Sequence, residues 1–172
     1  MKKTDIGVVS NVVKKELVKN AILSVIIASL GIILYVSIRF KFSYAISGVI
    51  ALVHDVFMII AIFSLFRFEV SSIFIAAILS IIGYSINDTI VTFDRTREIY
   101  NSRKKIKTKD DLKEVINEGL RSTLTRSIIT TVTTLIPVIC LIVFGSHEII
   151  YFNIALLIGL ISGVYSSIFI AS

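Results

Sequence analysis

The chain has 172 residues, of which 55% are hydrophobic and only 17% charged, against about 25% charged in a typical soluble domain. A mean hydropathy of +0.90 and a single proline exclude a disordered, collagen-like or low-complexity chain. The net charge of +6 does not indicate nucleic-acid binding, because nearly all charged residues lie in short polar breaks between apolar runs.

Apolar stretches dominate the sequence, and five of them are about 20 residues long, the length that crosses a hydrocarbon core. They are, in chain order, Asn20–Ile38, Ser43–Phe66, Val70–Phe93, Ser127–Gly145 and Ile149–Ala171. Each is expected to be a helix, because a backbone in lipid must satisfy its own hydrogen bonds. The sequence therefore predicts an all-α integral membrane protein, a bundle of five transmembrane helices. A soluble bundle is the alternative, which we disfavour because too little polar face remains to cover a surface.

The distribution of Lys and Arg predicts the orientation of these helices. Residues 1–19 form a basic lead-in that precedes a full-length apolar stretch without a small-residue cleavage site, so a removed signal peptide is not expected. Ten of the 18 basic residues lie in the third polar break, residues 94–126. The positive-inside rule predicts that this break is a cytoplasmic loop and that residues 1–19 are external. Residues 20–172 are then the membrane domain.

The loop at 94–126 contains a helical pattern of its own. Thr108 and Asp111 have the spacing of a capping box. Apolar residues then recur at helical intervals, at Leu112, Val115, Ile116 and Leu120. We expect a short cytoplasmic amphipathic helix that lies along the membrane surface. Basic neighbours could contact anionic membrane lipid, or could serve only to enforce the orientation; they are Arg103, Lys104, Lys105 and Lys107.

His54 and Asp55 lie halfway along the second stretch, where an ionisable side chain is costly. Adjacent positions on a helix point about 100° apart, so the two cannot bind one metal ion as a pair one turn apart could. For Asp55 two interpretations remain open, a neutral hydrogen-bonded carboxyl or a proton relay. For His54 we prefer a structural role.

Asp88 lies near the predicted cytoplasmic third of the third stretch, within a polar patch. The patch contains Gly83, Tyr84, Ser85, Asn87 and Thr89. Desolvation favours a protonated carboxyl and a nearby cation favours an ionised one, so a carboxyl balanced between the two can load and release a proton. We favour this function over a purely structural hydrogen bond.

Arg126 begins the fourth stretch and shares one helix face with Thr130, Thr133 and Pro137. A hydroxyl-lined face that ends in arginine suits a wet crevice, although threonines can also bond back to their own helix. Because Arg126 and Asp88 lie at one depth, we predict an ion pair between them. Pro137 is expected to loosen the helix.

The end of the third stretch reads GYSINDTIVTFDRTRE, from Gly83 to Glu98. This segment resembles the signature of SecF-type members of the SecD/SecF family of protein-export membrane proteins, within the RND type of transporters. Three further segments are similar to the family and follow in its order: ALVHD at 51–55, LRSTLTRSIITTVTTL at 120–135 and GVYSSIFIAS at 163–172. The resemblance covers the chain from about Lys14 onward.

The resemblance implies an RND/SecDF-like bundle in the bacterial cytoplasmic membrane, crossing it several times. It implies an accessory of the Sec translocase that, with SecD and the SecYEG-type channel, uses the proton motive force to move exported unfolded polypeptides. Asp88 would then be the carboxylate of proton conduction and Arg126 its charged partner. The expected polar core contains His54, Asp55, Asn87, Thr89, Thr130 and Thr133. The family motif contributes Gly83, Tyr84, Ser85, Asp94 and Arg95.

Some features depart from the family pattern. Thr96 replaces the usual aliphatic residue of F-D-R-x-R-E. Family members begin with a further span and a periplasmic domain ahead of the run found here, so we interpret the chain as the carboxy-terminal membrane part.

Three functional alternatives follow from the residues. The first is proton-coupled export as above, with Na⁺ as an open alternative ion, and the second is a passive structural subunit that packs against SecD. The third, an intramembrane aspartyl protease using Asp55 and Asp88, is disfavoured because the chain has H-D and N-D where such enzymes have Y-D and G-x-G-D. One cysteine, two histidines and the lack of a nucleotide-binding loop predict no metal, no cofactor and no enzymatic activity.

Overall fold

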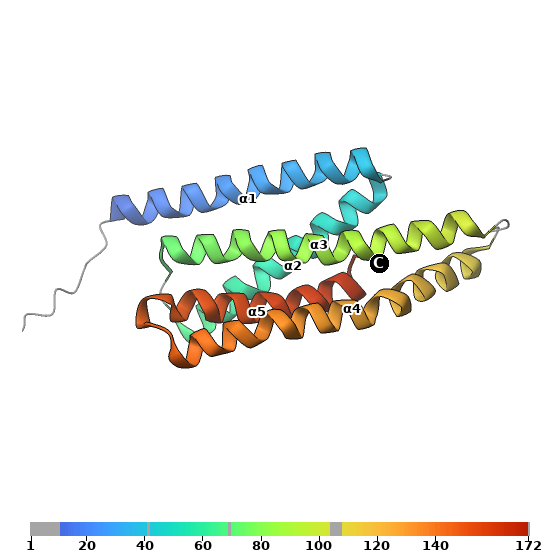
Figure 1. The fold of residues 1–172 in the computed structure, drawn as a ribbon. Coiled ribbons are helices and arrows are strands. Elements are labelled where there is room, and N and C mark those ends of the chain that lie inside the picture. The colour runs from blue at the N-terminus through green and yellow to red at the C-terminus, as the bar shows by residue number, and fades with distance from the viewer. Residues whose placement is uncertain (1–10, 41, 69, 104–107, 172) are drawn as a thin grey trace, which may run out of the picture.

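The computed structural model describes residues 11–40, 42–68, 70–103 and 108–171, which form helices joined by short connections (Figure 1). In chain order they are α1 (Asn11–Arg39), α2 (Phe42–Phe66), α3 (Ser72–Ser102), α4 (Lys109–Phe144) and α5 (His147–Phe169). Each of these five is long and apolar enough to cross a membrane, and the described residues contain no strand. The predicted all-α bundle of five membrane-spanning helices is confirmed.

The centre of the bundle is the pair formed by α3 and α5. α3 packs against all four other helices, and α5 packs against α2, α3 and α4. Among the described residues α1 contacts α2 and α3, and Figure 1 shows it along one side of the bundle. The buried core is built mainly from aliphatic and aromatic side chains of α2 and α3, among them Leu52, Ile59, Phe63, Ile81 and Phe93.

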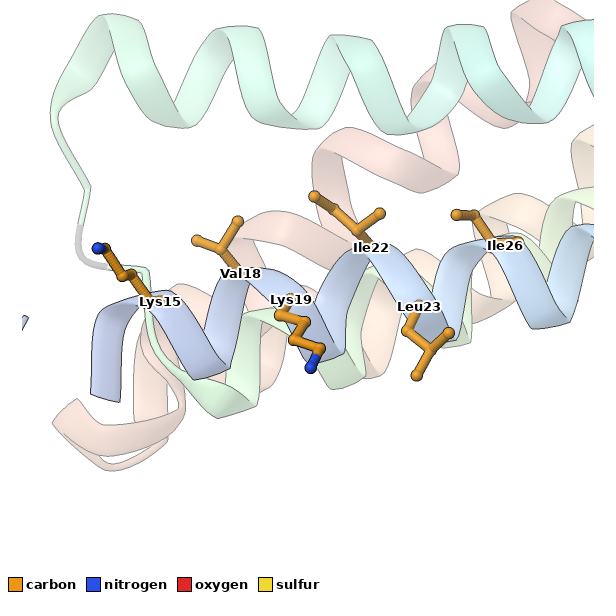
Figure 2. Close-up of a pocket in the computed structure, with 6 residues that line it drawn as sticks. All are labelled: Lys15, Val18, Lys19, Ile22, Leu23 and Ile26. Carbon is orange, nitrogen blue, oxygen red and sulfur yellow. The ribbon is translucent and has the colours of Figure 1, made fainter. Parts of the chain in front are cut away.

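The outer surface is apolar, as lipid contact requires. α1 exposes Leu23, Ile27 and Leu34 along its length, and α4 exposes Ile128 and Ile136. The first turns of α1 line a shallow, almost wholly apolar hollow of about 600 Å³. Figure 2 shows the residues that line it: Lys15, Val18, Lys19, Ile22, Leu23 and Ile26.

The amphipathic segment of the polar loop is helical, but it is not a separate helix along a surface. It forms the first part of α4, which runs unbroken for 36 residues, or about 54 Å. No proline separates the amphipathic residues from the apolar ones, so the helix continues through both. The ends of α3 and α4 extend side by side beyond the end of α5 (Figure 1).

Side-chain hydrogen bonds and ion pairs stabilise the outer end of this extension. The main-chain N–H and the hydroxyl of Thr108 both donate to the Asp111 carboxylate, at 3.0 and 2.9 Å, which confirms the predicted capping box. Arg103 donates to Glu114 at 3.0 Å and to Glu118 at 2.6 Å, and these bonds raise the pKa of Arg103. Its guanidinium therefore ties α3 to α4. The predicted lipid-facing Lys104, Lys105 and Lys107 lie outside the described residues.

The polar lead-in differs from its predicted form where it is described. Residues 1–10 lie outside the described residues, and α1 begins at Asn11, ahead of the predicted Asn20. Lysine and glutamate are good helix formers, so the helix continues into the polar segment. The same reasoning applies to α3, which continues to Ser102, past the predicted Phe93.

Small residues allow α5 to approach α3 closely. A Cβ atom at Gly159 would lie 2.6 Å from Cγ1 and 2.7 Å from Cγ2 of Ile81. At Gly163, one turn further along, it would meet Ser85 Cβ at 3.4 Å. The Gly159–Gly163 pair therefore lies at the central helix interface, as such small-residue spacings do in membrane proteins.

We expect Gly159→Ala to destabilise the bundle, because the added methyl group overlaps a β-branched side chain that has little freedom to move. Overpacking of this kind costs about 1–3 kcal/mol. Thermal unfolding in detergent, followed by circular dichroism, measures the effect. Gly31→Ala is the matched control, because a methyl group added there would meet no neighbouring atom within 4 Å. An equal melting temperature for the two variants would contradict the close approach.

Candidate functional site

The most deeply buried charge-bearing group is the carboxyl of Asp55, which is 1% exposed. Its Oδ1 accepts a hydrogen bond from Ser162 at 2.8 Å. Its Oδ2 accepts from Ser85 at 2.7 Å and from Ser166 at 2.8 Å. One α2 carboxyl thus joins a hydroxyl of α3 to two hydroxyls of α5. We call Asp55, Ser85, Ser162 and Ser166 the serine cluster.

A second bond between α3 and α5 lies next to the serine cluster. Thr89, one turn after Ser85, shares a hydrogen bond of 2.8 Å with Ser167. Both side chains are buried. The polar face of α3 therefore meets a polar face of α5 over two successive turns, inside an otherwise apolar core.

His54 lies at the edge of the same cluster. Its Nδ1 is 3.4 Å from Asp55 Oδ1, the outer limit of a hydrogen bond, and its side chain is 29% exposed. Its ring centroid is 5.9 Å from that of Tyr165 on α5. Adjacent helix positions diverge, as the sequence predicts, yet the imidazole still reaches the buried carboxyl and also the outside of the bundle.

Asp88 faces a different helix. Ser127 of α4 donates to Asp88 Oδ1 at 2.6 Å. Asp88 Oδ2 is buried and has no hydrogen-bond partner among the described residues. The carboxyl is therefore half satisfied, in contrast to the fully bonded Asp55.

Asp88 and Arg126 form no ion pair within the described residues, so this prediction is wrong. Arg126 is exposed on α4. Its neighbour Ser127 is buried and takes the place beside Asp88. The physical reason is the helical step of about 100° between adjacent residues, which turns Arg126 away when Ser127 faces α3.

The threonine face of α4 bonds to its own helix and points outward. Thr130 donates to the carbonyl of Arg126 at 2.8 Å, and Thr133 donates to the carbonyl of Ile129 at 2.7 Å. Together with Pro137, these residues are exposed, and α4 remains helical through the proline.

A polar crevice of about 450 Å³ does lie between the end of α1, the later part of α3 and the middle of α4. Arg126 lines it, but Asp88 does not. Asp94 lies there instead and accepts from Arg39 at 3.3 Å. Arg95 lies there too and donates to Glu98 at 2.6 Å and to Ser122 at 3.3 Å.

The remaining motif residues are dispersed. Gly83 and Asn87 are exposed and line a shallow groove of about 420 Å³ between α1 and α3. Tyr84 contacts Thr131 and Thr134 of α4, both at 3.4 Å. Within the part of the chain that the structure describes, no three His, Cys, Asp or Glu side chains gather as metal ligands.

Sequence reasoning missed four partners of the buried polar groups, namely Ser127, Ser162, Ser166 and Ser167. Three of them lie on α5, in the stretch that contains the Gly159–Gly163 pair. Serines spaced about one turn from these glycines are a signal for a close polar helix contact, since small hydroxyl residues favour membrane helix interfaces.

Comparison with known proteins agrees with the motif resemblance. The family model described as "Protein export membrane protein SecD/SecF, C-terminal" matches residues 1–172. The chain is 53% identical over 168 residues to protein translocase subunit SecDF of Bacillus subtilis, covering 98% of this chain and 23% of that protein. It is 49% identical over 160 residues to protein translocase subunit SecF of Alicyclobacillus acidocaldarius, covering 93% of this chain and 52% of that protein.

A solved structure has the same fold. The crystal structure of SecDF from Thermus thermophilus superposes with a TM-score of 0.86 at 34% sequence identity, over 94% of this chain and 22% of that one. Of the SecF relative from Alicyclobacillus acidocaldarius, the chain spans about half the length. These relatives are named as translocase subunits, which agrees with the expectation of a non-enzymatic chain.

We expect Ser166→Ala to lower thermal stability, because it removes a hydrogen bond to the buried Asp55 carboxyl. A hydrogen bond of this kind contributes about 0.5–1.5 kcal/mol. Ser80→Ala is the matched control, since that hydroxyl is exposed and donates to the Ala76 carbonyl of its own helix. Thermal unfolding of both variants in the same detergent measures the difference, and equal losses would contradict a stabilising serine cluster.

Proposed function

The chain belongs to the SecD/SecF protein-export family, and we propose that it couples the proton motive force to export as the SecF-type membrane part of the Sec translocase. In this proposal it works with SecD and a SecYEG-type channel on exported unfolded polypeptides. The substrate itself is handled by parts of the assembly outside this bundle.

The carboxyl of Asp88 is the observation that carries the proposal. It lies at a helix interface inside the membrane domain, with one oxygen bonded to Ser127 and the other buried without a partner among the described residues. A single hydrogen bond commits the group neither to the charged nor to the neutral form. A change of charge on this carboxyl would alter its hydrogen bonding against α4.

The outer face of α4 supports pairing with SecD. Arg126, Thr130 and Thr133 are exposed there, and an arginine in a membrane helix avoids lipid tails where it can. The Bacillus subtilis relative is a single SecDF protein, which the chain matches over 98% of its own length. We propose that SecD covers this face and that Arg126 serves the proton path from there rather than through a direct bond to Asp88.

The α3–α4 extension supports the cytoplasmic placement of residues 94–126. Arg39, Arg95 and Arg97 gather at the base of this extension, where Arg97 donates to the Arg39 carbonyl at 2.8 Å. Cationic side chains are retained on the cytoplasmic side, where they can also meet anionic lipid headgroups.

The serine cluster favours a second candidate function, that of a passive subunit in which polar groups only specify packing. Fully satisfied buried bonds of this kind fix helix register. The protease alternative has no such support. Asp55 and Asp88 are bonded to separate serines in different interfaces, so the described residues contain no paired carboxyl site.

We expect Asp88→Asn to abolish the proton-dependent stimulation of export, because the amide keeps the shape of the carboxyl but cannot exchange a proton. The measurement uses inverted membrane vesicles that contain the chain with SecD and the channel. Translocation of a precursor is followed with and without a protonophore. Asp110→Asn is the control, since Asp110 is exposed and its ion pair among the described residues is with Lys113.

The two candidate functions give opposite results in this assay. Full protonophore-sensitive export by Asp88→Asn would refute proton coupling at this residue. If the variant instead loses co-purification with SecD while Asp110→Asn retains it, the passive structural function is the correct one.

A further inference from the structure

The Asp55 carboxyl is buried in the bundle without a permanent cation beside it. α2 and α5 contain no Lys or Arg, and the first basic residue of α3 is Arg95. An ionised carboxylate in such surroundings is costly even when three hydroxyls donate to it. Either a proton on the carboxyl or a positive charge beside it removes this cost.

The other titratable groups near the cluster leave one candidate for that charge. On α3, Asp88 bonds to Ser127, and Tyr84 bonds to threonines of α4. On α5, the ring of Tyr165 lies against His54 and not against the carboxyl. His54 remains, with its Nδ1 3.4 Å from Asp55 Oδ1. Imidazole is also the side chain that exchanges protons near neutral pH.

The serine hydroxyls suit both charge states of Asp55. Each is a donor and an acceptor, so it can turn when the carboxyl gains a proton. Ser166 already has a second acceptor, the Gly163 carbonyl at 3.1 Å, besides Asp55 Oδ2 at 2.8 Å. When the carboxyl is neutral, the Ser166 hydrogen can move to that carbonyl without any displacement of the backbone.

The oxygen atoms of the serine cluster are hydrogen-bonded directly to one another, which leaves no space for a metal ion between them. Its hydroxyl oxygens lie 2.7–2.8 Å from the carboxylate oxygens, in direct hydrogen bonds. A cation between them would require these bonds to break, whereas a proton fits the existing arrangement.

We propose that Asp55 is a second proton-binding site of the bundle, loaded and emptied through His54. The proton moves from Nδ1 of the imidazolium to Oδ1 of the carboxylate, leaving neutral imidazole and neutral acid. His54 takes up its next proton on its exposed side. The site rests on the proposed proton coupling for its biological role, but proton binding at Asp55 can be measured independently of Asp88.

The test is pH-difference infrared spectroscopy of the purified chain in lipid vesicles, which detects the carbonyl stretch of a protonated carboxyl. We expect a band that disappears as the pH rises, that is absent in Asp55→Asn and that persists in Asp88→Asn. An unchanged band in Asp55→Asn overturns the proposal. Because the Asp55 band is read in Asp88→Asn, failure of proton coupling at Asp88 leaves this result intact.

The relay is tested by the rate at which the band responds to a pH jump. His54→Gln should slow it by about 100-fold, the lower end of what a positioned proton-transfer group contributes. Ser80→Ala should leave it unchanged. An unchanged rate in His54→Gln overturns the role of His54.

A further variant covers the case in which Asp55→Asn does not insert. Ser166→Ala removes a hydroxyl from Oδ2 and should shift the frequency of an Asp55 carboxyl band, whereas a band from any other carboxyl would stay in place. A band unmoved in Ser166→Ala overturns the assignment to Asp55.

Discussion

The bundle depends on the hydrogen bonds that the Asp55 carboxyl accepts from three serines. Inside a membrane domain no water is available to hydrogen-bond to a polar group, so the group bonds to a neighbouring helix that supplies a partner. Here the partners come from α3 and α5, so one α2 side chain fixes the mutual positions of three helices. The glycines of α5 make this possible, because Gly163 lets the helices approach until the hydroxyls reach the carboxyl.

The two buried carboxyl groups divide the bundle into two interfaces that share α3. Asp55 lies where α2, α3 and α5 meet and is fully bonded, whereas Asp88 lies against α4 and is half bonded. Ser85 and Asp88 are less than one turn apart on α3. A change of charge on either side therefore acts on the same helix. The Asp55 carboxyl contributes three hydrogen bonds to the packing of the helices, and the Asp88 carboxyl contributes one.

The sequence predicted the helices well and the partners of the acidic groups poorly. Hydropathy located all five spans, because apolar length is a local property that a membrane selects strongly. The ends were less accurate, since α1 and α4 continue into polar segments whose residues also favour helix. The pairing of Asp88 with Ser127 instead of Arg126 could not be predicted from the sequence, because it depends on the rotation of α4 about its axis. The serines of α5 were missed because hydroxyl residues barely alter hydropathy.

The unbroken length of α4 has a mechanical consequence. Its 36 residues form one continuous helix, with the Asp88 contact at Ser127 near its middle and the ion pairs of Arg103 near its beginning. Because no proline lies between Ser127 and the amino end of α4, a displacement at the Asp88 contact would be transmitted along this helix to the α3–α4 extension.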